Sequence, residues 1–311
     1  MKTKTAAKPR RKRWKKTIAV YGMLLPGMIY LVINNYLPMY GITIAFRKLD
    51  YSVGILRSPF NGLENFKFLF ASSSVITALR NTLLYNTAFL ILGPVLAITV
   101  AILFNEIKNQ VAKKFYQTSI LLPFLMSMVI VSYLVYAFLS ADNGFLNKSV
   151  IEPLTGDTIS FYQEKSYWPF ILTFVHFWKE IGFSMVLYLS SILGISNEFY
   201  EAARMDGATK WQQIRYITLP FLKPTVITMT ILGISKICNS DFGLFYQVPR
   251  NSGTIYATTQ TIDTYVYNAL MNQNNISMSS AASVLQAIVG FILVIAANAV
   301  IRKVSREDAI F

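Results

Sequence analysis

The chain has 311 residues, of which 54% are hydrophobic and only 14% are charged. Soluble domains carry roughly 25% charged residues, so this composition excludes an ordinary soluble protein. The formal net charge is +14. Because the apolar runs are long enough to cross a bilayer, we interpret the basic excess as cytoplasmic loops of a membrane protein rather than as a nucleic-acid surface.

Several kinds of site are excluded by what the chain lacks. Cys238 is the single cysteine and His176 the single histidine, so neither an internal disulfide nor a His/Cys metal cluster can form. No phosphate-binding loop of the form GxxxxGK[ST] occurs. We therefore expect no cofactor in this chain, and ATP with its Mg²⁺ would be bound by a partner.

Residues 1–16 form a basic arm with nine Lys and Arg side chains. The pattern predicts a disordered cytoplasmic segment against the anionic lipid of the inner leaflet. A cleaved signal peptide is excluded because the following apolar stretch, 18–46, is too long and lacks a small-residue cleavage site.

Residues 17–311 are predicted to form an all-α integral membrane domain, because a span needs about 20 mostly apolar residues. The six segments that qualify are Ile18–Ala45, Thr82–Phe104, Gln117–Leu139, Pro169–Ile195, Leu219–Asn239 and Ser283–Ile301. Pro26 and Pro38 predict a kink or an early end in the first segment.

The orientation follows from the Lys and Arg residues of the connections. The N-terminal arm, the connections 105–116 and 196–218 and the C-terminal tail are basic, whereas 140–168 and 240–282 carry few cations. The connection 46–81 holds five Lys and Arg residues, which weakly favours the opposite orientation. We expect both termini and the 196–218 connection in the cytoplasm of a bacterial cell, and the chain in its plasma membrane.

The connection 196–220 is polar and helix-prone although it lies between two apolar spans. Ser196 offers a helix cap, and Gly207 would weaken a long helix or permit a turn. A second amphipathic stretch begins near Trp211, and Pro220 suits the first turn of the next span. These features fit either a helix lying on the lipid headgroups or a docking element for a cytoplasmic partner.

The same connection resembles the EAA motif of membrane subunits of binding-protein-dependent ABC importers. That motif reads Glu-Ala-Ala, three residues, Gly, nine residues, Ile, one residue, Leu-Pro. The chain supplies it with every gap correct, from Glu201 through Gly207 and Ile217 to Pro220. The resemblance implies docking to an ATPase subunit through Glu201, Ala202, Ala203, Arg204, Asp206, Gly207 and Ala208.

Two further stretches, GLENF at 62–66 and TIDTYVY at 261–267, are similar to the maltose-type permeases of oligosaccharide and polysaccharide importers. This resemblance implies a type I importer permease fold with a cytoplasmic coupling helix, working by alternating access. It also implies a second related permease, two ATPase subunits, an extracellular binding protein attached as a lipoprotein, and an oligosaccharide substrate. We expect the chain to lack the extra N-terminal spans and the large extracellular domain of some relatives, so functions tied to those parts do not carry over.

Polar residues within the fourth and fifth segments are candidates for the substrate path, because such groups usually face a cavity or a partner. Counting from Glu201, the resemblance places sugar-contacting positions near His176, Glu180, Phe183, Ser235, Lys236 and Asn239. Helical spacing predicts one face for the first three and another for the last three. The alternative is a packing role, with Glu180 and Lys236 forming an interhelical ion pair and His176 satisfied inside the bundle. For Lys179 we expect snorkelling or pairing with the second permease.

The predicted function is therefore transport without covalent chemistry. An integral-membrane enzyme is disfavoured, because the chain lacks paired carboxylates or a Ser/Lys pair at credible spacing. A permease for a non-carbohydrate solute remains the alternative, since the EAA motif alone would permit it. The identity, length and charge of the glycan are left open.

Overall fold

The computed structural model describes residues 10–50, 52–54 and 57–304, with side chains from 20 to 299 outside those gaps and at 302. Within this part the chain is helical, and its only extended pairing is an isolated antiparallel bridge between Arg47 and Phe60. The first nine residues of the predicted basic arm lie outside the described residues. The rest of the arm is not a loose segment, because the first helix already begins at Arg10.

The long helices are α1 (Arg10–Leu31), α4 (Ser73–Asn105), α5 (Gln110–Leu125), α6 (Met128–Leu139), α8 (Trp168–Leu193), α11 (Leu219–Ser235) and α15 (Ile276–Val304). The shorter ones are α2 (Leu37–Met39), α3 (Glu64–Ala71), α7 (Glu152–Thr155), α9 (Asn197–Met205), α10 (Lys210–Gln213), α12 (Phe242–Gln247), α13 (Tyr256–Thr259) and α14 (Ile262–Met271). Tighter 3₁₀ turns cover Tyr40–Phe46 and Gly253–Ile255, and wider π-helical turns cover Val32–Tyr36, Asn147–Ile151 and Ile214–Thr218.

Five helical segments are long and apolar enough to cross a membrane, and a bent pair makes a sixth. The five are Val20–Phe46, Ser73–Asn105, Trp168–Leu193, Lys210–Ser235 and Ile276–Ala299. The prediction of an all-helical, six-span membrane protein is confirmed in this sense. In the first span the helix widens into a π-turn just before Pro38, whose missing N–H cannot continue the regular ladder.

The predicted third span, 117–139, is not one continuous helix. The structure divides it into α5 and α6, which meet at an angle of 98°. Pro123 lies in the last turn of α5, and Ser127 caps α6 by accepting from the amide of Ile130 at 3.4 Å. Because Met126 and Ser127 are extended, the helical ladder stops there and restarts in a new direction.

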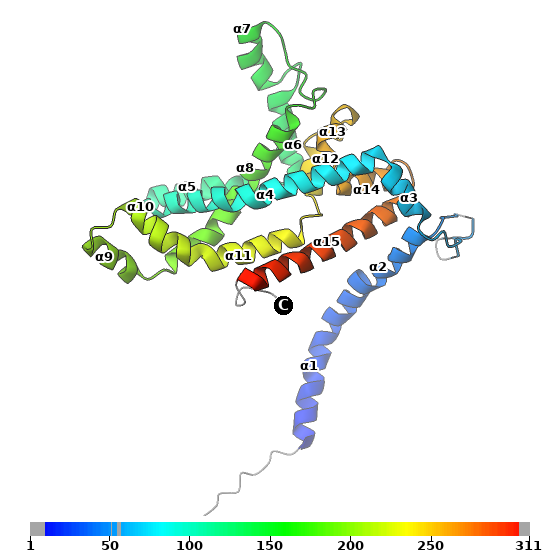
Figure 1. Cartoon of the computed structure of the whole chain (residues 1–311), viewed down its shortest axis with the longest axis horizontal. Coiled ribbons are helices and arrows are strands. Elements are labelled where there is room, and N and C mark those ends of the chain that lie inside the picture. Colours follow the sequence, from blue (N-terminus) through cyan, green and yellow to red (C-terminus); the bar gives the residue numbers. More distant parts are fainter. Residues whose placement is uncertain (1–9, 51, 55–56, 305–311) are drawn as a thin grey trace, which may run out of the picture.

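The bundle core lies where α4 and α8 pack along each other, with α5, α11 and α15 beside them (Figure 1). One apolar cluster, which includes Trp168 and Phe245, joins α4, α6, α8 and α12. A second, which includes Met185 and Leu222, joins α4, α8 and α11. The helices α9 and α10 lie at one end of this bundle, and α3, α12 and α14 lie toward the other end.

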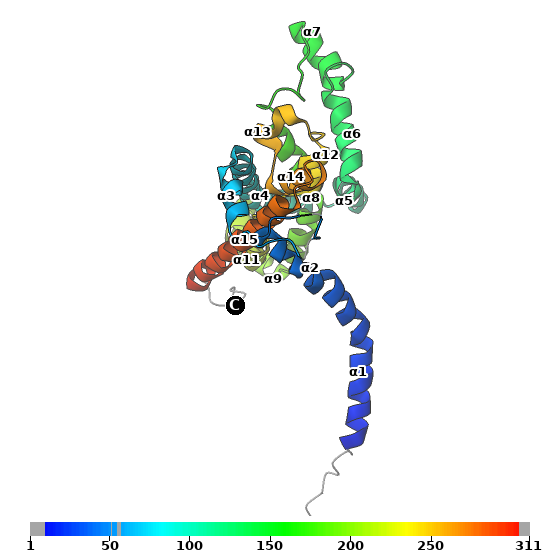
Figure 2. The same ribbon diagram turned by 90° about the vertical axis from the view of Figure 1, so that its right-hand side faces the viewer.

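The first helix stands apart from the bundle. In both views α1 leads away from the other helices, and only the segment that follows it packs against α15 (Figures 1 and 2). In the most apolar 18-residue window of Val20–Phe46, 0% is buried inside the chain. In the corresponding window of Trp168–Leu193, 28% is buried. The long apolar surface of α1 is therefore available to lipid or to another protein.

Candidate functional site

The segment 196–218 folds as the short helix α9 and, after a tight turn, the helix α10, which continues through the π-helical turn Ile214–Thr218 into α11. The predicted turn at Gly207 is therefore confirmed. Ser196 caps α9 by accepting from the amide of Glu198 at 3.4 Å. At the other end of α9 the amide of Gly207 donates to the carbonyl of Arg204 at 3.0 Å, and the amide of Ala208 donates to Ala203 at 2.8 Å. This pair of bonds is the Schellman arrangement, which requires a left-handed residue after the helix.

Gly207 supplies that left-handed residue, with φ of +79°. A Cβ atom at this position would meet nothing within 4 Å in this chain. The glycine is therefore needed for its backbone conformation and not for space within the chain. Thr209 then starts α10 with a capping box, in which its side chain and that of Gln212 each accept from the other's backbone amide.

Most of the predicted docking residues lie on an exposed surface. Glu201, Ala202, Arg204, Asp206 and Gly207 are exposed, whereas Ala203 and Ala208 are half-buried. No side chain of α9 is buried. Two large apolar side chains share this surface, Met205 at 89% exposure and Trp211 at 66%. An apolar surface with fixed charges around it, at the end of a bundle, is suited to protein docking.

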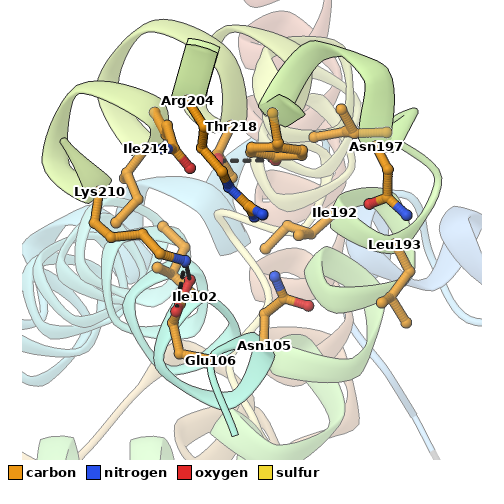
Figure 3. A pocket seen from close by; sticks show the side chains of 13 residues that line it. Ile102, Asn105, Glu106, Ile192, Leu193, Asn197, Arg204, Lys210, Ile214 and Thr218 are labelled. Atoms are coloured by element: carbon orange, nitrogen blue, oxygen red, sulfur yellow. Dashed lines mark hydrogen bonds and ion pairs between the residues drawn. The ribbon is translucent and has the colours of Figure 1, made fainter. Parts of the chain in front are cut away.

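Behind this surface lies a hollow of about 230 Å³ between the two short helices and the ends of α4 and α8 (Figure 3). Lys210 makes an ion pair with Glu106, at 2.9 and 3.0 Å to its two carboxylate oxygens. The hydroxyls of Tyr200 and Thr218 lie 3.0 Å apart. These contacts connect the exposed pair of helices to the end of α4 and to the start of α11.

On α8 the structure brings His176, Glu180 and Phe183 to one helical face, but it gives them different surroundings. His176 stacks on Phe89 with ring centroids 3.7 Å apart, and its Nδ1 atom is buried without a hydrogen-bond partner among the described residues. The expectation of a satisfied packing histidine is therefore wrong. Phe183, 44% exposed, stacks on Phe124 at 4.7 Å.

Lys179 is buried, and its ammonium donates to the carbonyl of Phe124 at 2.8 Å. That carbonyl belongs to the last turn of α5, where the break before α6 removes its helical partner. The same ammonium lies 5.3 Å from the Phe124 ring centroid. The expectation of snorkelling is therefore wrong. Lys179 instead caps the broken helix of its own chain, as a cation does well at a helix C-terminus.

The predicted common face of Ser235, Lys236 and Asn239 is also wrong. The helix α11 ends at Ser235, and the chain then turns through Lys236 into an extended connection. Asn239 lies in this connection, where its side-chain oxygen accepts from Gln286 at 3.0 Å.

Sequence reasoning missed the three side chains that hold this turn. Asn86 on α4 donates to the carbonyl of Ile237 at 2.7 Å, and Gln286 on α15 donates to that of Cys238 at 2.7 Å. Asp263 accepts from both the amide and the hydroxyl of Ser240, at 2.6 and 2.7 Å. Asn86 and Gln286 are polar residues inside apolar segments, and that signal would have identified them.

The predicted ion pair between Glu180 and Lys236 does not form. The ion pairs among the described residues are Lys148–Glu152 and Lys210–Glu106. Lys236 is exposed, and Glu180 is half-buried on α8. The two side chains are therefore not explained by packing against each other.

Comparison with known proteins decides the family. Residues 93–306 match the model of the binding-protein-dependent transport system inner membrane component. The chain belongs to this family. These permeases include the protein LplB of Bacillus subtilis (strain 168), which is 33% identical over 93% of the chain and 90% of the relative. They also include YteP of the same organism, a polygalacturonan/rhamnogalacturonan transport system permease protein, which is 36% identical over 93% and 89%.

The fold of the permease is that of solved importers. It is similar to a chain in the crystal structure of a bacterial ABC transporter involved in the import of the acidic polysaccharide alginate, with a TM-score of 0.86 and 32% identity over 94% of this permease and 98% of that chain. A second structure shows the alginate transporter in complex with its alginate pentasaccharide-bound periplasmic protein. Its matching chain has a TM-score of 0.85 at 31% identity, covering 96% of this permease and 98% of that chain. A multi-pass transport permease of a non-catalytic family is thus established.

Proposed function

We propose that this permease moves oligosaccharide from an extracellular binding protein into the cytoplasm by alternating access. The exposed pair α9–α10 carries the proposal most directly. It presents the motif from Glu201 to Gly207 on a capped turn at one end of a membrane bundle, and the end of the motif, from Ile217 to Pro220, leads into α11. A partner that moves this pair also moves α4, through the Lys210–Glu106 ion pair, and α11, which follows α10 along the chain.

The partner at this surface is an ATPase subunit, which binds ATP and Mg²⁺. Glu201 and Asp206 offer exposed carboxylates and Met205 offers an exposed apolar side chain, whereas the side chain of Arg204 points into the hollow behind them (Figure 3). The carboxylates fix the register of docking, whereas the apolar contact supplies binding free energy. In this scheme residues 17–311 work as one permease domain, residues 196–220 form its coupling loop, and the arm 1–16 lies against lipid.

A second, related permease covers α1. The apolar window of the first span buries nothing within its own chain, although the other candidate spans bury 11–28% of theirs. Van der Waals packing drives helix association in a bilayer. A cysteine in place of Met28, which is 59% exposed, should crosslink to the second permease. Crosslinking to lipid analogues alone would contradict this assignment.

The substrate path runs along one face of α8 and the turn after α11, through His176, Glu180, Phe183, Ser235, Lys236 and Asn239. Two observations support it. The Nδ1 atom of His176 is buried without a partner, and Lys236 carries a charge without an ion-pair partner among the described residues. Groups of this kind gain partners when a sugar presents hydroxyls or when the bundle rearranges.

The carbohydrate class rests on the relatives. Named relatives transport polygalacturonan and rhamnogalacturonan, arabinooligosaccharides and lactose, and the structural neighbour imports the acidic polysaccharide alginate. One relative is named for osmoprotective compounds, so a non-carbohydrate solute is the second candidate. The names include acidic and neutral sugars, and they do not fix the charge of the substrate.

Uptake by the reconstituted transporter tests this function. Proteoliposomes with both permeases, the ATPases and the loaded binding protein should accumulate labelled oligosaccharide when ATP is enclosed with the ATPase domains. Labelled amino acids should not accumulate. Accumulation of amino acids but of no oligosaccharide would refute the carbohydrate assignment and leave the importer assignment standing.

Cysteine labelling tests the orientation in a variant that lacks Cys238. A cysteine at Asn143 or Gly253 should react with an impermeant thiol reagent from outside the cell, whereas one at Thr209 should react only after the membrane is opened. The opposite pattern would place α9 and α10 outside and would remove the ATPase from this surface.

A further inference from the structure

The turn between α12 and α13 holds two successive residues in the left-handed region, Arg250 with φ of 55° and Asn251 with φ of 48°. Asparagine tolerates this conformation, but arginine rarely adopts it. Strained backbone of this kind persists only where the surroundings over-determine it, and it gathers at functional sites. The turn lies beside α6, toward the end of the bundle that is far from α9 and α10 (Figure 1).

A hydrogen-bond network holds the turn in place. The amide of Asn251 donates to the carbonyl of Tyr246 at 3.0 Å. The side-chain oxygen of Asn251 accepts from the Tyr256 hydroxyl at 2.7 Å and from the Asn268 amide group at 2.9 Å. Because this network fixes Asn251 on both its backbone and its side chain, it also fixes the position from which the side chain of Arg250 leaves the turn.

The guanidinium of Arg250 rests on tyrosine. Its Cζ atom lies 4.2 Å from the ring centroid of Tyr136 and 5.8 Å from that of Tyr133. Arg250 is exposed, and it takes part in neither of the ion pairs found among the described residues. A cation–π contact orients the charge but leaves the planar donors at its edge free for a ligand.

A hollow of about 240 Å³ opens beside this cation, and Tyr133, Tyr246, Gln247 and Ser132 contribute to its lining. Pockets that enclose a whole drug-sized ligand measure roughly 300–1,000 Å³. The hollow therefore suits one residue of a longer chain. Its lining combines aromatic rings, which pack on the C–H faces of sugars, with the amide of Gln247, which meets sugar hydroxyls. One face of the Tyr246 ring is stacked on Phe242, so its other face and its edge are the parts open to a sugar.

We propose that this hollow is an entry subsite for a carboxylate-bearing sugar residue, a hexuronate, of the transported oligosaccharide. The inference rests on the proposed function and deepens it by assigning the charge of the substrate. Arg250 binds the carboxylate through its two-pronged donors, as arginine does in preference to lysine. Tyr133 and Tyr246 flank the sugar ring, and the strained turn keeps the cation aimed at the hollow before substrate arrives.

Direct binding to the permease tests the subsite without the binding protein. The assembled transporter, held in lipid nanodiscs, is titrated with trigalacturonate and with its methyl ester while saturation-transfer NMR reports contact. The two probes share every hydroxyl and differ in charge. Arg250→Gln should weaken binding of the acid about ten-fold and leave that of the ester unchanged, because a charge-assisted bond is lost only for the acid.

Two further variants separate this role from general charge and from folding. Arg250→Lys keeps the charge without the planar fork, so binding of the acid should fall by an intermediate factor. Lys165→Gln removes a cation from another exposed position of the same end of the bundle, and it should change neither titration. Nanodisc yield should be the same for all of these proteins.

Several results would overturn the proposal. One is a wild-type protein that shows no transfer to trigalacturonate. Another is an equal loss for the acid and the ester, which would make Arg250 a packing residue on Tyr136. A loss of binding-protein docking with unchanged titrations would assign Arg250 to protein contact. Uptake of neutral oligosaccharides by the same transporter is measured separately. That result tests the importer function independently of the proposed subsite.

Discussion

Replacing Gly207 by alanine tests whether the geometry of the coupling loop matters for transport. The position has φ of +79°, and left-handed backbone costs a non-glycine residue roughly 1–2 kcal/mol. A Cβ would meet nothing within 4 Å, so no steric term from this chain is added. We therefore expect Gly207→Ala to destabilise the turn by about 1 kcal/mol, and Gly207→Asn by less, because asparagine tolerates this region.

Hydrogen exchange measures this change directly. The amide of Ala208 is protected by its bond to the carbonyl of Ala203, at 2.8 Å. A loss of about 1 kcal/mol in local opening free energy makes exchange at this amide roughly five-fold faster. Gly156→Ala is the matched control. Gly156 has φ of +81° and equally open space, but it ends α7 outside the coupling loop.

Transport then separates local strain from function. Gly207→Ala should import less sugar per ATP hydrolysed, because a loop that opens more often transmits less of the ATPase motion. Gly156→Ala introduces the same backbone strain outside the coupling loop, and it should import as much sugar per ATP hydrolysed as the wild type. If the two variants import the same amount of sugar per ATP hydrolysed, the coupling role is refuted. Unchanged exchange at Ala208 in Gly207→Ala would refute the argument from the backbone angle.

Three other predictions concern stability, and each is checked by the apparent melting temperature of the purified permease. Gly182→Ala should lower the free energy of unfolding by about 1–3 kcal/mol, because its Cβ would overlap a backbone carbonyl of α5. Gly93→Ala is the control and should leave the stability unchanged, because its Cβ would make only an ordinary contact at 3.8 Å. Asp263→Asn should lower the free energy of unfolding by about 1–3 kcal/mol, because it removes the carboxylate that accepts from both the amide and the hydroxyl of Ser240. Lys236→Met should leave the stability of the permease nearly unchanged, because Lys236 forms no ion pair with Glu180. The stability changes of Lys236→Met and Glu180→Gln should add in the double variant to within about 0.5 kcal/mol. A double variant more stable than Lys236→Met alone would indicate an ion pair and contradict this prediction.

The sequence by itself determined the class of the protein and the position of its coupling loop. Apolar length decides membrane spans almost independently of tertiary context, because a bilayer leaves every backbone group to be satisfied within the helix. The turn at Gly207 was equally local. A glycine between two helix-prone stretches, with Ser196 and Thr209 as caps, needs only neighbouring residues to form.

Only the tertiary structure decided how polar groups inside the bundle are used. Periodicity placed Lys236 and Asn239 on a helical face, but α11 ends at Ser235, where side chains from α4, α14 and α15 hold the turn that follows. The break between α5 and α6 likewise depends on Lys179, 55 residues away from the carbonyl that it caps. A buried charge or a freed carbonyl is stable only beside its partner, and no local pattern in the sequence states which distant residue that partner is.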